Sequence, residues 1–455
     1  MLKNKKMLGG AVTLGAGTFI AKILGALYRI PLTNMIGSYG LGLYQMVFPL
    51  YTVLLDFSGA GVPSALSKLI SSSGGRANNY AATTYLGVSL KIFAVLGFLG
   101  SVIMAAFSGL FAKWQGDAQA TIGYVSLAPA VLGVCIISCY RGYFQGLMEM
   151  RPTAFSQITE QTVKLAVGLL LVWSLMPDVR LAVAGATFAI TVSEAAALVQ
   201  LYLNYKKSVK KSDVKPFIKE KNNFRQIALK IIVTTVPVTL TGIAIPLSHV
   251  IDSFQIINVL SLYRADATSL FGLLTGVTVT VINLPVSVCY GVAATALPSV
   301  ASATDGKEKN RNSLKALLLT LAVSLPCALF CFLFPNFIIG LLFKKLAADE
   351  KIIAVNLLRL CSPCVVLLSV LQTSNAVLIG KNRLYTPFAV MLSAIALKAV
   401  INAFLLKNPA LNIYGGAVAL IACYFFAGLL NFILVFTLKA KDGNKKYKFF
   451  EQTNG

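Results

Sequence analysis

Residues 316–343 read ALLLTLAVSLPCALFCFLFPNFIIGLLF, a run of 28 positions without a charged side chain. A helix needs only about 20 apolar residues to cross the hydrocarbon core of a bilayer, so this run is long enough. It lacks the alternation of apolar and polar residues that is typical of a membrane barrel strand. Because a segment in lipid must satisfy its own backbone hydrogen bonds, the run predicts a transmembrane α-helix.

Eleven other apolar runs fill most of the remaining chain, and each predicts a helix. The predicted spans are residues 7–36, 41–71, 80–112, 119–147, 153–176, 180–205, 226–258, 268–302, 313–343, 351–379, 386–407 and 413–438. The 455-residue chain is 57% hydrophobic and 12% charged, against roughly 45–50% and 25% in soluble domains. This composition excludes a soluble globular protein and a disordered one, and the fold class predicted is an all-α integral membrane protein.

Positive charge is concentrated on one side of the predicted spans. With the N-terminus in the cytoplasm, 25 Lys and Arg residues, Arg141 among them, fall on the cytoplasmic side and 7 on the other. This bias indicates that both termini are cytoplasmic and that the number of spans is even. The net charge of +24 therefore reflects membrane orientation, and we expect no nucleic-acid partner.

One long basic stretch, residues 206–225, divides the chain between the sixth and seventh spans. It predicts an N-lobe at 1–205, a cytoplasmic linker, and a C-lobe at 226–455 that ends in a basic tail. The linker could bind anionic lipid headgroups or could simply be solvated. The segment that starts at Gly61 resembles the one that starts at Gly291, which favours two pseudo-repeated six-helix lobes around a central cavity.

The eight cysteines all fall inside apolar runs. We interpret them as small buried hydrophobic residues, and the single Cys361-Ser-Pro-Cys364 pair is too little to predict a metal site. The chain also has no phosphate-binding loop with a Walker lysine, so ATP is not expected to supply energy.

Charged residues inside the predicted spans are the functional candidates, because each costs about 2.5–3.5 kcal/mol at the bilayer centre. They are Lys22, Arg29, Asp56, Lys91, Glu160, Lys164, Glu194, His249, Asp252, Arg359 and Lys398. More of them lie in the first lobe, which we therefore expect to carry most of the polar chemistry.

Lys22 and Arg29 are seven residues apart, so they share a helix face about 10.5 Å apart along the axis. With Asp56 as the one nearby acid, that face predicts a binding site for a phosphate or diphosphate. Two alternatives stay open: Arg29 could reach the outer headgroups, and Lys22 could form an internal ion pair with Asp56.

The other intramembrane charges have weaker interpretations. Glu160 and Lys164 are spaced i, i+4 and predict a structural ion pair. Glu194 could be a cation site or could pair with Lys164. The i, i+3 spacing of His249 and Asp252 could serve a proton or cation step, or a structural hydrogen bond.

Several motifs resemble one membrane protein family. They are Lys22-Ile-Leu-Gly-Ala-Leu-Tyr-Arg29, Gly37-Ser-Tyr-Gly-Leu-Gly-Leu-Tyr-Gln45, Gly61-Val-Pro-Ser-Ala-Leu-Ser-Lys68, Arg141-Gly-Tyr-Phe-Gln-Gly146 and Met150-Arg-Pro-Thr-Ala-Phe-Ser-Gln-Ile-Thr-Glu-Gln161. The chain is similar over its whole length to the multidrug/oligosaccharidyl-lipid/polysaccharide (MOP) exporter superfamily. Within it, the polysaccharide transporter branch of sporulation stage V protein B and Gram-positive lipid II flippase-like proteins is most similar.

The resemblance implies a flippase, not an enzyme, that moves an undecaprenyl-diphosphate-linked oligosaccharide or peptidoglycan precursor across the bacterial cytoplasmic membrane by alternating access. It implies that Lys22 and Arg29 contact the diphosphate. The chain departs from the family in two ways: position 22 is Lys where relatives usually carry Arg, and twelve spans are predicted where lipid II flippases have fourteen.

We expect no cofactor, with energy coming from Na⁺, H⁺ or the membrane potential. The expected partners are the lipid-linked saccharide, membrane lipids and cell-wall synthesis proteins, and the expected state is a monomer. The main alternative function is a cation-coupled multidrug antiporter of the related MATE type. A membrane glycosyltransferase or ligase is less well supported, because no long external loop could hold a catalytic site. A non-transporting scaffold is less well supported because it would not need charges inside the membrane.

Overall fold

The computed structural model describes residues 2–59, 61–75, 79–210, 224–301, 303, 305–383 and 385–438. All regular secondary structure in these residues is helical. By internal packing, the chain forms two compact units. The first contains the chain up to Val277 together with Leu342–Glu350, and the second contains the rest.

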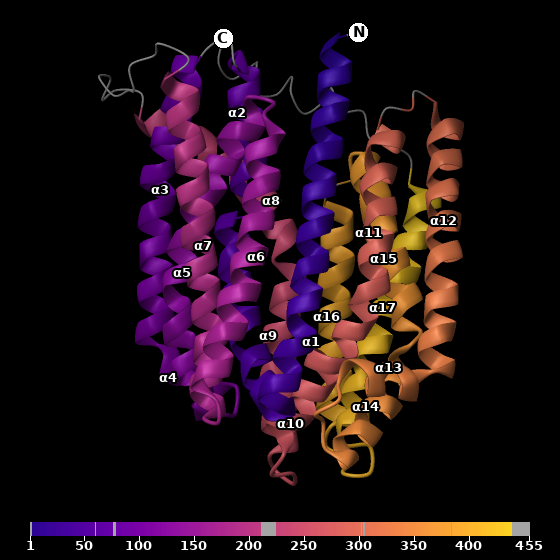
Figure 1. The fold of residues 1–455 in the computed structure, drawn as a ribbon. Coiled ribbons are helices and arrows are strands. Elements are labelled where there is room, and N and C mark those ends of the chain that lie inside the picture. The colour runs from indigo at the N-terminus through magenta and orange to yellow at the C-terminus, as the bar shows by residue number, and fades with distance from the viewer. Residues whose placement is uncertain are drawn as a thin grey trace. The chain divides into compact units, whose positions relative to one another are not determined.

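Long helices form the body of the first unit, and α3, α5, α6 and α7 run alongside one another (Figure 1). The elements of this unit are α1 (Leu2–Gly59), α2 (Gly61–Ser72), α3 (Asn79–Ala106), α4 (Ser108–Trp114), the 3₁₀ turn η2 (Ala118–Ala120), α5 (Thr121–Gly146), α6 (Met150–Leu175), α7 (Val179–Lys210), α8 (Phe224–Gly242), α9 (Ala244–Leu260), α10 (Ala267–Phe271) and the π-helical segment η3 (Gly272–Thr278).

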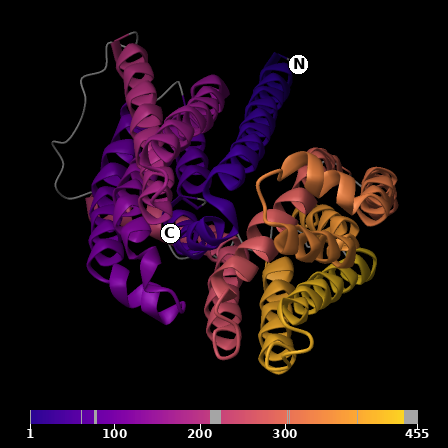
Figure 2. The same cartoon turned by 60° about the horizontal axis from the view of Figure 1, so that its bottom comes forward.

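The second unit is a bundle in which α15 contacts α11, α12 and α17. Figure 2 shows the helices of this unit in salmon, orange and yellow. Its elements are α11 (Val279–Ala301), α12 (Gly306–Leu333), α13 (Pro335–Leu342), α14 (Ala348–Cys361), α15 (Cys364–Gly380), α16 (Tyr385–Leu405) and α17 (Ile413–Thr437).

The described residues of all twelve predicted spans lie mainly in helices, but α1 runs through the first predicted span and most of the second, and several other spans consist of a short series of helices. Among the described residues, nine helices are long and apolar enough to cross a membrane, and the bent pair α14 and α15 would make a tenth. This count is below twelve partly because Thr13–Ser72 is counted once although it covers two predicted spans, and because α9 is too short. The all-helical membrane fold is confirmed, and several of the predicted spans consist of two or more helices separated by short breaks.

The helix breaks have local causes in the sequence. Gly37 interrupts α1 with φ 70° and ψ −173°, a conformation that glycine adopts without the steric cost of a side chain. Pro335 begins α13 and Pro363 precedes α15, since proline cannot donate the backbone hydrogen bond that would continue a helix.

The predicted boundary between lobes at 206–225 includes residues 211–223, which lie outside the described ranges. The helices that follow it, α8 and α9, pack against α2 and α1 of the first unit. The division into two six-helix lobes stays a prediction. All eight cysteines lie in helices, and all but Cys327 are buried.

Small residues bring α1 close to α6. A Cβ atom at Gly17 would lie 2.6 Å from the Cβ of Ala154, and one at Gly168 would lie 2.7 Å from the hydroxyl of Tyr28. Helices in lipid approach closely where small residues face one another. The two contacts flank Lys22 along α1, and they therefore fix the helix face that carries this lysine against α6.

Candidate functional site: a charged pocket in the first unit

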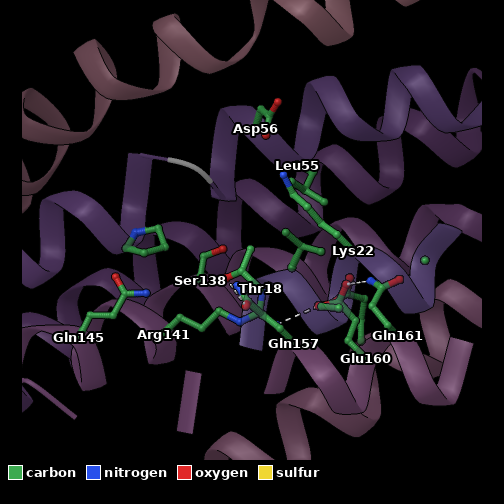
Figure 3. A pocket seen from close by; sticks show the side chains of 15 residues that line it. Thr18, Lys22, Leu55, Asp56, Ser138, Arg141, Gln145, Gln157, Glu160 and Gln161 are labelled. Atoms are coloured by element: carbon green, nitrogen blue, oxygen red, sulfur yellow. Dashed lines mark hydrogen bonds and ion pairs between the residues drawn. The ribbon is translucent and has the colours of Figure 1, made fainter. Parts of the chain in front are cut away.

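A pocket of about 460 Å³ lies within the first unit. Fifteen residues from α1, α2, α5, α6 and α7 line it, and Figure 3 shows their side chains. They are Thr18, Ala21, Lys22, Gly25, Leu55, Asp56, Pro63, Val134, Ser138, Arg141, Gln145, Gln157, Glu160, Gln161 and Glu194. All five helices belong to long apolar segments, so the polar groups are concentrated inside a largely apolar bundle.

Helix α1 contributes one stripe of residues to the pocket. Thr18, Lys22 and Gly25 are spaced i, i+4 and i+7, which places them on one face of a helix. The Thr18 hydroxyl donates to Gln157 Oε1 at 2.9 Å and so connects this face to α6. In Figure 3 the Lys22 side chain extends toward Leu55 and Asp56, which lie further along α1.

Arg141 of α5 and Glu160 of α6 form the central ion pair. The distance from Nη2 to Oε2 is 2.9 Å, and Arg141 Nε also donates to Ser156 Oγ at 3.0 Å. The second oxygen of Glu160 accepts from Gln161 Nε2 at 2.9 Å. The guanidinium is therefore fixed in the pocket wall by two acceptors on the neighbouring helix.

Glu194 of α7 is the most deeply buried charged residue of the pocket, with 3% of its surface exposed. Its Oε1 accepts a hydrogen bond from the Tyr51 hydroxyl at 3.1 Å. Its Oε2 is also buried and has no hydrogen-bond partner. Gly133 of α5 makes room for it, because a Cβ there would lie 3.1 Å from the Cβ of Glu194.

The pocket therefore holds charges of both signs. Lys22 and Arg141 are its cations, and Asp56, Glu160 and Glu194 are its acids. The sequence predicted a face with excess positive charge, whereas the structure surrounds Lys22 with more acidic groups than the one expected. An anionic ligand in this pocket would contact two cations but would also meet carboxylates.

The structure brings together four of the predicted site residues, namely Lys22, Asp56, Glu160 and Glu194. The other four do not line this pocket. Arg29 lies with its Cζ 5.9 Å from the centre of the Phe48 ring, and Lys164 has its Nζ 5.7 Å from the centre of the Tyr28 ring.

His249 and Asp252 lie on α9, with Nδ1 and Oδ2 4.0 Å apart, and Asp252 is buried. The i, i+3 relationship expected from the sequence is therefore present, although neither residue belongs to the pocket lining. Whether the pair moves a proton or a cation stays a prediction.

The predicted ion pair of Glu160 with Lys164 is wrong, because Glu160 forms its ion pair with Arg141. Sequence analysis placed Arg141 among the cytoplasmic anchoring charges, but it lies within α5 and lines the pocket. A signal for it existed: Ser138, Arg141 and Gln145 follow one face of a helix that is otherwise apolar.

Long apolar helices around a charged pocket define a polytopic membrane protein of the transporter class. The chain belongs to the polysaccharide biosynthesis protein family, whose model matches residues 7–268. The predicted membership of the MOP superfamily is confirmed.

Among curated proteins, the chain is 26% identical to the lipid II flippase MurJ of Bacillus subtilis (strain 168) over 95% of this chain and 83% of that one. It is also 26% identical to the stage V sporulation protein B of the same organism, over 68% of this chain and 60% of that one.

Solved structures show the same fold. An inward-facing multidrug resistance MATE family transporter of the MOP superfamily matches with a TM-score of 0.73, at 14% identity and over 96% of both chains. A MOP superfamily transporter from Pyrococcus furiosus, described as having a binding pocket of reverse polarity, matches with a TM-score of 0.67, at 16% identity and over 94% of both chains. These similarities confirm the predicted MATE-like fold.

Proposed function

We propose that this chain is a flippase that moves a lipid-linked saccharide precursor with a diphosphate headgroup across the membrane by alternating access. Two relatives over much of the chain, a lipid II flippase and a sporulation protein, support this substrate class, as does membership of a polysaccharide biosynthesis family. Because the relative that covers 95% of this chain is named a flippase, a transporter is favoured over an enzyme.

The observation that carries the proposal is the convergence of Lys22 from α1 and Arg141 from α5 on one pocket. A guanidinium presents paired donors that match phosphate oxygens, and an ammonium adds a mobile point charge. Thr18 and Ser138 add hydroxyl groups, and Gln145 adds an amide. This combination suits a diphosphate with a first sugar attached.

The size of the pocket agrees with a headgroup site. Small-molecule sites commonly measure about 300–1,000 Å³, and this pocket measures about 460 Å³. The lining has room for a diphosphate and sugar, so the long lipid tail would stay in the bilayer. We propose Lys22 and Arg141 as the diphosphate contacts. Arg29, which was predicted to be one of them, does not line this pocket.

The finer aspects of the function belong to the same proposal. The membrane would be the bacterial plasma membrane, with both termini in the cytoplasm, as the charge bias indicates. The protein would act as a monomer on its lipid-linked substrate, with cell-wall synthesis proteins as neighbours.

The test is reconstitution into liposomes with a labelled undecaprenyl-diphosphate-linked saccharide, followed by measurement of its movement between leaflets. Lys22→Ala and Arg141→Ala should each slow translocation by about tenfold or more, because a hydrogen bond to a charged group contributes about 1.5–3 kcal/mol. Lys91→Ala is the matched control, since Lys91 is an exposed lysine of α3. Translocation that is unchanged in both pocket variants would rule out this headgroup site.

A cation-coupled drug antiporter is the second candidate. It is favoured by the three carboxylates in the pocket, Asp56, Glu160 and Glu194, which would attract cationic substrates. Efflux of a cationic dye from the same liposomes, lost in Glu194→Gln and unaffected by Lys22→Ala, would support this function over the flippase.

A further inference from the structure

Glu194 is a buried acid with one unused oxygen. Only 3% of its surface is exposed, its Oε2 has no hydrogen-bond partner, and it lines the charged pocket. A carboxylate that is buried with incomplete pairing is costly to keep ionised. The side chain therefore needs a positive group or a proton when the local charge becomes more negative.

The groups that face Glu194 come from three helices packed against α7. They are Tyr51 of α1, Arg141 of α5, and Glu160 and Lys164 of α6, while Lys22 and Asp56 of α1 line the same pocket. Arg141 is already bound to Glu160 and Ser156. Lys164 lies over the ring of Tyr28. Glu194 forms its direct hydrogen bond with Tyr51, Arg141 and Lys164 act on it electrostatically without an ion pair, and the ion pair of the pocket belongs to Glu160.

A diphosphate in this pocket would change the balance of charge. It would compete with Glu160 for the guanidinium of Arg141 and would add negative charge close to three carboxylates. Like charges within a few ångströms of one another repel strongly where water is excluded. Protonation of one carboxylate removes most of this repulsion. Glu194 is best placed to accept the proton, because its buried Oε2 has no hydrogen-bond partner.

We propose that Glu194 takes up one proton when an anionic diphosphate headgroup enters the pocket, so that headgroup and proton bind cooperatively. This inference rests on the proposed function and names a second ligand of the same site. Because linkage is reciprocal, headgroup affinity rises as the pH falls, by at most tenfold per pH unit for one linked proton.

A proton fits the site better than a metal ion. Hard cations need several oxygen ligands at once, and the described residues contain no cluster of three or more His, Cys, Asp or Glu side chains that could hold a metal. The oxygen atoms that meet at Glu194 are its own carboxylate and the Tyr51 hydroxyl. A requirement for sodium in place of protons would overturn the proposal.

The experiment is titration calorimetry of the full-length protein in nanodiscs with inorganic pyrophosphate, in buffers of the same pH that differ in ionisation heat. The difference between buffers gives the number of protons taken up per pyrophosphate bound. Wild type should take up about one more proton than Glu194→Gln, and subtraction removes protons that belong to the probe itself. Glu194→Asp keeps the acid and should keep the uptake.

Glu308→Gln is the matched control, because Glu308 is exposed in the first turn of α12, and it should behave like wild type. Glu194→Gln should also bind pyrophosphate with an affinity that depends less on pH. Equal proton uptake in wild type and Glu194→Gln would overturn this proposal alone. Failure of pyrophosphate to bind wild type at any pH would overturn it together with the proposed diphosphate site.

Discussion

Arg141 and Glu160 join α5 to α6 through a 2.9 Å ion pair whose side chains are only 17% and 19% exposed. Removing one member of a pair that is largely shielded from water leaves a charge without compensation. The pair therefore has two consequences: it stabilises the contact between the helices, and it keeps the guanidinium at the pocket wall.

A double-mutant cycle should measure this coupling. Arg141→Met and Glu160→Gln are each expected to destabilise the protein, and the double variant should recover about 1–2 kcal/mol of the summed loss. The measurement is thermal unfolding in detergent. Arg180 and Asp178 form the control pair at 3.3 Å, with 50% and 37% exposure, and their coupling should be much smaller. Equal coupling in the two cycles would contradict the shielding argument.

Contact between α1 and α6 should depend on the absence of a side chain at Gly17. Gly17→Val places atoms against Ala154, where a Cβ alone would lie 2.6 Å from the neighbouring Cβ. Overpacking of this kind costs about 1–3 kcal/mol, so the melting temperature should fall. Gly15→Val is the control, because nothing lies within 4 Å of a Cβ at that position. A fall of the same size in both variants would show a general effect on helix propensity.

The sequence predicted the helical fold well because every span is a long apolar run with few alternatives in lipid. It predicted the positions of the helix breaks less well. The interruption at Gly37 depends on backbone angles that apolar composition does not encode, and α4 continues the apolar run of α3 without a change of pattern. Pro335 does mark the start of α13, but proline also occurs inside continuous helices of this chain, such as Pro326 in α12.

The site was partly predictable. Intramembrane charge was enough to single out Lys22, Asp56, Glu160 and Glu194, which share the pocket. Spacing along one helix suggested Lys164 as the partner of Glu160, yet the partner is Arg141, 19 residues away on another helix. Contacts between helices depend on which faces meet, and spacing within one helix does not determine this.

In the second unit, Lys381 is expected to stabilise the end of α17. It is buried, and its Nζ donates to Val435 O at 2.6 Å and to Asn310 Oδ1 at 2.8 Å. Burial lowers the pKa of this lysine from its usual value, but the two acceptors and the helix C-terminus favour the ammonium. Lys381→Met should cost about 1–3 kcal/mol of unfolding free energy, because two acceptors lose their donor.

Chemical or thermal unfolding measures that loss, with Lys407→Met as the control because Lys407 is exposed. If the Lys381→Met protein were as stable as wild type, the free-energy cost of burying the Lys381 charge would equal the stabilisation from its two hydrogen bonds.

Asn34 should hold residues 342–350 against the break in α1. Its Nδ2 donates to Leu342 O at 2.7 Å, and its Oδ1 accepts from the backbone N–H of Lys345 at 3.2 Å. Ser38, on the other side of Gly37, donates to Glu350.

In Asn34→Ala both contacts of the Asn34 side chain with Leu342 and Lys345 disappear. The amide of Lys345 should then exchange with deuterium about tenfold faster, which corresponds to about 1.4 kcal/mol. Asn204→Ala is the control, because the Asn204 side chain donates to Gln200 O within its own helix. Mass spectrometry of peptides covering 342–350 gives the rates; unchanged exchange there in Asn34→Ala would mean that Ser38 and Glu350 hold the segment without Asn34.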